Sequence, residues 1–137
     1  ADGHQVFQYK NGRSEVFWQD RQRGRPNGIW NEKDRLLIAT SISGQLISLD
    51  KSTRTKRIVA KKIGRGDGIE AVGENDYLIT DYSGRIFYFS PLENMHLLLD
   101  RRGKKHTADI EYIPSKQLLI VPNHRNNTVQ AFRLNWK

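Results

Sequence analysis

The hydrophobic positions of this chain follow the short runs that are typical of β-strands. Residues 5–9 alternate between polar and apolar side chains, and residues 15–18 form a second run after the pair Asn11-Gly12. An Asn-Gly pair between two such runs predicts a β-hairpin. No apolar stripe with the period of a helix persists for about ten residues. The pattern therefore predicts an all-β chain.

The strand pattern repeats at a spacing of about 40 residues. Pro26-Asn27-Gly28-Ile29 returns as Gly66-Asp67-Gly68-Ile69, and the strand, turn and strand of residues 38–46 return as residues 78–86. A looser third copy begins at Thr107-Ala108-Asp109-Ile110. Repeats of this length that consist of short strands are typical of propeller blades or of a solenoid. We expect the first strand of each repeat to lie nearest a common axis.

The repeat predicts that the chain is a single segment of a six-bladed type of β-propeller, with about three blades present as a half ring or a fragment. The expected parts are an outer hairpin over 4–20, a blade over 26–62, a blade over 66–100 and an incomplete blade over 106–135, within the single segment 1–137. Propellers usually close with about four to eight blades. This segment therefore needs further blades to complete a ring.

Open strand edges at the two ends of such a segment invite pairing with another chain. One possibility is a head-to-tail homodimer, in which residues 15–19 of one copy complete the final blade of the other and residues 5–9 are left over. The other possibility is a missing N-terminal half of the same protein. The number of repeats leaves both possibilities open.

Basic residues are concentrated in the loops that lead into the expected inner strands. The formal net charge is +8, and ten of the 23 lysine and arginine residues lie in the loops 21–25, 61–65 and 101–106. In a propeller these loops share the axial face, where a focused positive field attracts anions. Arg25, Arg65 and His106, with Asp109 beside them, are therefore candidates for an anionic-ligand site. The alternative is that these are ordinary solvated loops.

An oxygen-bearing side chain recurs where each inner strand begins. Asn27 and Asp67 occupy matching positions, and the third copy has Ala108 with Asp109 beside it. Amide and carboxylate oxygens suit Ca²⁺, Mg²⁺ or Mn²⁺. A dication there would polarise an ester or lactone carbonyl, and Asp67 could act as general base. The alternative is that Asn27 and Asp67 only cap the turn before the strand.

The composition excludes several classes of protein and leaves the compartment open. There is no cysteine, so disulfides, thiolate metal sites and cysteine nucleophiles are excluded. No apolar run approaches the roughly 20 residues of a membrane span, and no signal-peptide core precedes the first strand. We expect a soluble chain without a membrane span, which could be cytoplasmic, periplasmic or secreted.

The motifs Pro26-Asn27-Gly28-Ile29, Gly66-Asp67-Gly68-Ile69 and Ala108-Asp109-Ile110, with the strand–turn pairs 78–85 and 119–129, carry a family resemblance. They resemble the gluconolactonase/regucalcin-like six-bladed propellers, with strictosidine-synthase-like and paraoxonase-like proteins as more distant relatives. The resemblance covers nearly the whole chain and corresponds to the last three blades of that family.

This resemblance implies a divalent cation, Ca²⁺, Mn²⁺, Mg²⁺ or Zn²⁺, held by Asn27 and Asp67, with Asp67 also the proton acceptor. The family's glutamate ligand comes from its first blade and has no counterpart in this sequence. The implied activity is that of a lactonase or esterase acting on a small molecule. The alternative is a non-catalytic propeller that binds an anionic ligand, a nucleic acid or a protein through the basic loops, although nucleic acid is not the favoured partner.

Overall fold

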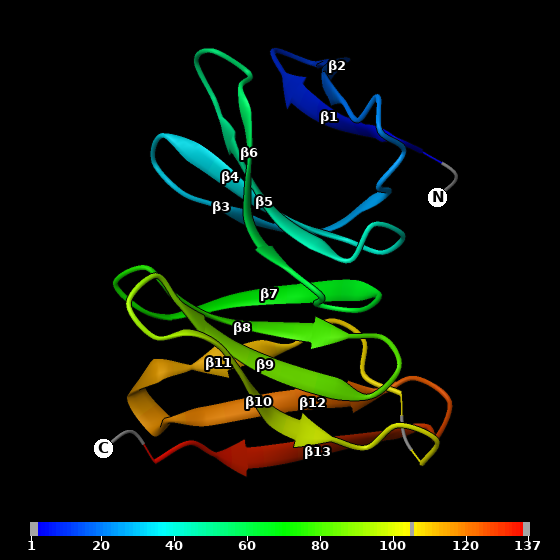
Figure 1. The fold of residues 1–137 in the computed structure, drawn as a ribbon, viewed down its shortest axis with the longest axis vertical. Coiled ribbons are helices and arrows are strands. Elements are labelled where there is room, and N and C mark those ends of the chain that lie inside the picture. Colours follow the sequence, from blue (N-terminus) through cyan, green and yellow to red (C-terminus); the bar gives the residue numbers. More distant parts are fainter. Residues whose placement is uncertain (1–2, 105, 136–137) are drawn as a thin grey trace.

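The computed structural model describes residues 3–104 and 106–135 and consists of four antiparallel sheets, which follow one another along the chain (Figure 1). We call these sheets blades 1 to 4. Blade 1 contains β1 (Gln5–Lys10) and β2 (Arg13–Gln19). Blade 2 contains β3 (Pro26–Asn31), β4 (Arg35–Thr40), β5 (Gln45–Asp50) and β6 (Lys56–Lys61). Blade 3 contains β7 (Gly66–Gly73), β8 (Asp76–Asp81), β9 (Arg85–Ser90) and β10 (Asn94–Asp100). Blade 4 contains β11 (Glu111–Ile113), β12 (Leu118–Asn123) and β13 (Thr128–Arg133).

Within each sheet the strands lie side by side in the order in which the chain visits them. Because the described residues form strands and a single short helical turn, the all-β prediction is confirmed. The described residues contain one short 3₁₀ helix, Pro114–Lys116, and no helix among them is long and apolar enough to cross a membrane. The inner strands β3, β7 and β11 are neighbours, because β7 contacts both of the others.

The hairpin of β1 and β2 forms around the Asn-Gly turn that the sequence predicts. Asn11 and Gly12 both adopt positive φ, 52° and 78°, as a tight hairpin turn requires. The β1–β2 pairing has a bulge between Val6 and Phe7. Blade 2 has the same irregularity 40 residues later, between Leu46 and Ile47 of β5. β1 and β2 are therefore the third and fourth strands of a blade, and residues 5–9 pair with β2 as the predicted hairpin requires.

Strand register defines which residues of different blades are equivalent. Pro26 pairs with Thr40 and Gly66 pairs with Asp81. An isolated bridge joins Thr107 to Asn123 at the same place in blade 4. The ungapped sequence comparison matched Thr40 with Thr80, and this match is wrong by one residue. The cause is one extra residue in the β7–β8 hairpin, because Gly66 and Asp81 are 15 positions apart whereas Pro26 and Thr40 are 14 apart. The turn between Asp81 and Arg85 is one residue shorter than the turn after Thr40, which restores the 40-residue spacing.

The core lies between consecutive blades rather than inside any one sheet. We call the face of a blade that turns toward the next blade its trailing face, and the opposite face its leading face. Between blades 2 and 3, one cluster joins Leu37, Ala39 and Leu46 to Ile69, Tyr77, Ile79 and Phe89. Similar clusters join blade 1 to blade 2 and blade 3 to blade 4. Burying each large side chain contributes about 1.5–3 kcal/mol, so face-to-face packing holds the blades in place.

Candidate functional site

The beginnings of the inner strands meet at one rim, which we call the axial rim. Counting from the register pairs, Asn27 and Asp67 are equivalent and the matching residue of blade 4 is Ala108. Asp109 lies one residue further on, at the position of Gly28 and Gly68. The third oxygen-bearing side chain therefore enters the rim from a different position than the first two.

Two glycines allow the inner strands to approach this closely. A Cβ atom on Gly28 would lie 1.7 Å from the carbonyl oxygen of Asp67, and one on Gly68 would lie 2.7 Å from Oδ1 of Asp109. Side chains are therefore excluded at both positions. The absence of a side chain on Gly68 makes room for the Asp109 carboxylate, whose Oδ1 also accepts a hydrogen bond from the Ile110 amide at 3.0 Å.

Asn27 and Asp67 are in direct contact. The Nδ2 amide of Asn27 donates to Oδ1 of Asp67 at 2.9 Å and to the Gly66 carbonyl at 3.3 Å. Both residues line a cavity of about 250 Å³, together with Asp109, Trp30 and Glu70. The predicted ligand pair and the neighbouring carboxylate thus share one cavity.

The cavity concentrates negative charge. Burial, and then the charge of Asp109, raises the pKa of Asp67, while hydrogen bonding from Asn27 and the charges of His124 and Arg65 oppose the rise. Glu70 lies deeper along β7, and burial together with the Glu111 carboxylate raises its pKa to about 7. In both carboxylates burial and a neighbouring negative charge outweigh the groups that favour ionisation, and a bound cation would relieve this repulsion.

Near Asp67, cationic and aromatic side chains gather around Tyr82, in the turn after β8. The Arg65 guanidinium lies 5.0 Å from the centre of the Tyr82 ring. The rings of His106 and His124 lie 5.4 and 5.7 Å from the same ring. His106 is held in addition by a 3.1 Å contact between Nδ1 and the Tyr82 carbonyl. We call Arg65, Tyr82, His106 and His124 the rim cluster.

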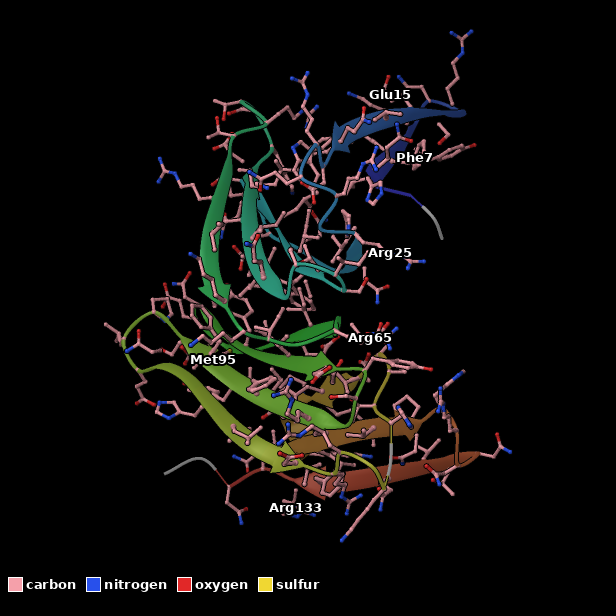
Figure 2. All side chains as sticks on the ribbon, turned by 45° about the vertical axis from the view of Figure 1, so that its right-hand side comes forward. Phe7, Glu15, Arg25, Arg65, Met95 and Arg133 are labelled. Atoms are coloured by element: carbon pink, nitrogen blue, oxygen red, sulfur yellow. The ribbon has the colours of Figure 1, made fainter. Side chains whose placement is uncertain are left out.

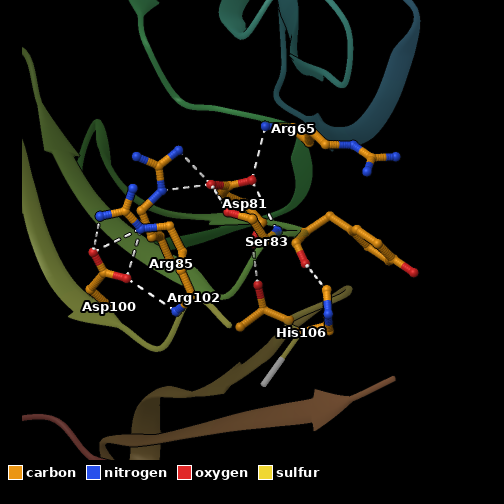
Figure 3. Close-up of polar contacts among 9 residues, drawn as sticks. Arg65, Asp81, Ser83, Arg85, Asp100, Arg102 and His106 are labelled. Carbon is orange, nitrogen blue, oxygen red and sulfur yellow. Dashed lines mark hydrogen bonds and ion pairs between the residues drawn. The ribbon is translucent and has the colours of Figure 1, made fainter. Parts of the chain in front are cut away.

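Asp81 holds the loop that carries Arg65 (Figure 3). Its buried carboxylate accepts hydrogen bonds from the Arg65 amide at 2.9 Å and the Ser83 hydroxyl at 2.6 Å, and it pairs with Arg85 at 2.6 Å. Burial alone would raise the pKa of Asp81, but these bonds outweigh burial and lower it. The rim cluster therefore rests on a buried ion pair.

Thr80 joins blade 3 to blade 4 at the same rim. Its hydroxyl accepts a hydrogen bond from the Gly68 amide at 2.7 Å and donates one to the Ala108 carbonyl at 2.7 Å. The hydroxyl of Thr107 donates to the Asp81 carbonyl at 2.5 Å. These bonds set the position of Asp109 relative to Asp67.

The three basic loops do not contribute equally to the rim. Arg25 and Arg65 extend on the same side of the molecule (Figure 2), and the carbonyl of Arg25 accepts the Ser41 amide at 2.9 Å. Arg101 instead lies 5.3 Å from the Phe132 ring centre, and Arg102 pairs with Asp100 at 2.6 Å. Lys105 lies outside the described residues. The third loop therefore uses two of its cations for contacts within blades 3 and 4.

Sequence reasoning did not select Tyr82, Trp30, Glu70 or His124 as site residues. A signal for two of them was present, because Tyr82 follows Asp81 and His124 follows Asn123, which are equivalent in register. That equivalence becomes visible only after the one-residue correction. Trp30 and Glu70 occupy matching positions on β3 and β7, and no motif identifies them.

The donors at the axial rim suit a hard divalent cation in kind but do not form a complete set. Asn27, Asp67 and Asp109 offer amide and carboxylate oxygens, the ligands that such cations prefer. Across the described residues, no three histidine, aspartate or glutamate side chains converge as a complete metal-binding group. Water or further protein ligands would have to complete the coordination.

Comparisons with known proteins bear on the fold. No protein-family model matches the chain, and no curated protein matches it. Among solved structures, it is similar to a streptogramin B lyase, with a TM-score of 0.72 and 14% identity over 96% of this chain. It is also similar to virginiamycin B lyase from Staphylococcus aureus, with a TM-score of 0.66 and 9% identity over 96% of this chain. These neighbours are propeller proteins.

The chain is a partial β-propeller. It covers 48% and 49% of the two lyase chains, and thus spans about half their length. A third similar structure is the computationally designed Ika4 protein, with a TM-score of 0.62 and 10% identity over 90% of this chain and 74% of that one. At these identities the similarity establishes the fold alone. The finer prediction of a gluconolactonase/regucalcin-like relationship stays a prediction.

Proposed function

We propose that this partial propeller belongs to a divalent-cation-dependent hydrolase of the gluconolactonase/regucalcin-like kind, which opens a lactone or an ester. The observation that carries the proposal is the contact between Asn27 and Asp67, two oxygen-bearing side chains on adjacent inner strands, inside a cavity that Asp109 also lines. The resemblance in sequence and the propeller fold support the same conclusion. The chemistry belongs to this site rather than to the fold, because propellers have many functions.

In this proposal Asn27 and Asp67 hold the cation and Asp109 lies beside them. Calcium, manganese, magnesium or zinc, when bound, would polarise the substrate carbonyl and make a bound water more acidic. Asp67 accepts the proton of the attacking water, and its raised pKa makes it a stronger base than an exposed aspartate. Arg65 places positive charge near Asp67, with His106 beside the same Tyr82 ring, which favours anionic substrates and the carboxylate product.

The test removes bound metal from the chain with a chelator and then adds back each cation. Unfolding free energy and lactone hydrolysis are measured before and after the addition. We expect one of the four cations to stabilise the protein by about 2.7 kcal/mol when its free concentration is one hundred times its Kd. Asp67→Asn and Asn27→Ala should each abolish this stabilisation. A chain that shows neither metal stabilisation nor hydrolysis with any of the four cations contradicts the proposal.

The matched control is Asp34→Asn, the same chemical change in the turn between β3 and β4, at the opposite end of blade 2 from the axial rim. Asp34 lines a separate groove of about 750 Å³. This variant should keep the metal response of the unmodified chain. If all three variants lose the response equally, the loss reflects general destabilisation rather than removal of ligands.

The rim cluster favours a second candidate function, which is non-catalytic binding of an anionic ligand. Arg65 stacks on Tyr82 with His106 and His124 around the same ring, so cations and aromatic faces are presented together. Single-stranded nucleic acid is a suitable probe, since it binds by stacking and by counterion release. Binding whose logarithm falls linearly with the logarithm of salt concentration, and which Arg65→Gln weakens, would favour this function.

A further inference from the structure

The two ends of the blade arc expose residues whose equivalents inside the arc are fully buried. On the trailing face of the third strand, Leu46 is 0% exposed in blade 2 and Ile86 is 1% exposed in blade 3. Register makes Val129 of blade 4 their equivalent, because it pairs with Pro122 as Ile86 pairs with Thr80. Val129 is 68% exposed. The trailing end thus presents an apolar face that packs against a following blade everywhere else in the chain.

The leading end shows the complementary exposure. Leu49 and Phe89, on the leading faces of blades 2 and 3, are 0% and 6% exposed. Their equivalent in β1 is Tyr9, which is 76% exposed, with the exposed Phe7 on the same face. On the inner strands, Ile69 and Ile110 are 3% and 5% exposed, whereas Ile29 at the same position is 45% exposed.

These two faces are the two halves of an interface that the chain already makes within itself. Leu46 of the trailing face of blade 2 shares a core cluster with Phe89 of the leading face of blade 3. Ile86 of blade 3 likewise shares a cluster with Phe132 of blade 4. We propose that a second copy of this chain binds head to tail, so that Val129 of each copy packs on Phe7 and Tyr9 of the other.

The geometry of the ends favours a second copy over an unrelated partner. Each chain carries one leading and one trailing end, and two such heterologous contacts close a ring when the rotation fits. Beside Phe7 lies an apolar groove of about 430 Å³ that also contains Ile29 and Lys51. The contact also brings a second set of inner strands to the open side of the axial cavity.

The test measures the mass of the chain in solution, first unmodified and then with opposite charges introduced on the two faces of the proposed contact. We expect the unmodified chain to sediment at twice 15.9 kDa at micromolar concentration. Val129→Lys and Tyr9→Glu should each weaken association at least tenfold, because each places a charge in an apolar contact. The double variant, and an equimolar mixture of the two single variants, should associate again, since a head-to-tail contact brings the introduced lysine of one chain to the introduced glutamate of another.

The control is Leu92→Lys, at a side chain that is 92% exposed in the turn between β9 and β10 and lies on neither end face. This variant should remain dimeric. A monomer at every concentration overturns the proposal and leaves the two faces to further blades of the same protein or to a different chain. A dimer that survives both single variants, or that the mixture fails to restore, also overturns it, because the contact is then elsewhere or is not head to tail. Circular dichroism of each variant verifies that the strands remain folded.

Discussion

Asp81 connects stability to the candidate site through a single buried carboxylate. It receives hydrogen bonds from the Arg65 amide and from Ser83, and it pairs with Arg85. Losing this buried carboxylate leaves the partly buried Arg85 guanidinium and the Arg65 amide without their partner. Arg65 would then no longer be held over Tyr82. The residue therefore matters to folding and to the rim cluster alike, although it does not face the axial cavity.

We predict that Asp81→Ala lowers the free energy of unfolding by about 3 kcal/mol, as expected when one partner of a buried ion pair is removed. Chemical denaturation measures this change. Asp100→Ala is the matched control, because Asp100 makes a similar short ion pair with Arg102 at the exposed surface. The control should shift the midpoint much less. Equal effects of the two changes would show that burial of Asp81 is not the cause.

Asp81 should also contribute to acid unfolding. Its pKa in the folded state lies below the ordinary value of 3.8, so its stabilising effect is complete above that value and is lost as the pH falls through the folded pKa. In Asp81→Asn the stability between about pH 5 and pH 2 should therefore fall less steeply than in the unmodified chain. Denaturation midpoints across this pH range measure the slope, and parallel curves would contradict the assignment.

Among the elements, the inner strands show how local sequence sets the spacing of functional groups. β3 and β7 approach so closely that the Asp67 carbonyl occupies the place of a Cβ on Gly28. The same approach brings the side chain of Asn27 to 2.9 Å from that of Asp67. Strand spacing and the proposed ligand geometry therefore depend on the same glycine.

We predict that Gly28→Ala costs at least about 1–3 kcal/mol of stability, because the clash is with backbone and no flexible side chain can move away. It should also weaken cation binding, since β3 and β7 must separate. Gly3→Ala is the control, because a Cβ there would have only the Gln5 amide nitrogen nearby, at 3.8 Å. Thermal unfolding with and without cation separates the two effects. A Gly28→Ala variant as stable as the control would contradict the strand spacing described above.

At the scale of the whole molecule, each blade packs only on its neighbours in the described part of the chain. The three core clusters join blades 1 and 2, 2 and 3, and 3 and 4 in turn. Stability in such an arrangement is close to a sum of blade and interface contributions, so the end blades are the least protected. The exposed end faces and the proposed second copy follow from the same arrangement.

We predict that amide hydrogen exchange is slowest in β4, β5, β8 and β9, which have a covering blade on both faces. Exchange should be faster in β1, β2 and β13 at low protein concentration, because these strands open locally at low free-energy cost. Raising the concentration should slow exchange in β1 and β13 specifically, as a second copy covers them. Uniform protection across all strands at low concentration would contradict the nearest-neighbour description.

Much of the fold could be predicted because strand propensity and turn chemistry are local. The Asn11-Gly12 hairpin, the strand order within blades and the repeat at about 40 residues all follow from neighbouring residues. The exact register between blades could not be predicted, because the β7–β8 hairpin contains one extra residue, the turn between Asp81 and Arg85 contains one fewer, and nothing local marks either change. With the register taken from the structure, Asp81 and Asn123 occupy equivalent positions. Tyr82 and His124, which follow them, are then equivalent residues of the rim cluster.

The sequence by itself determined that this protein is an all-β repeat and that Asn27 and Asp67 recur at one position of it. The tertiary structure alone decided that their side chains touch, that Asp109 enters the space left by Gly68, and that Arg65 and two histidines surround Tyr82. It also decided which apolar faces stay uncovered, at Val129 and Tyr9. The physical reason is that these contacts join residues distant along the chain, so they depend on how whole blades pack and not on local preference.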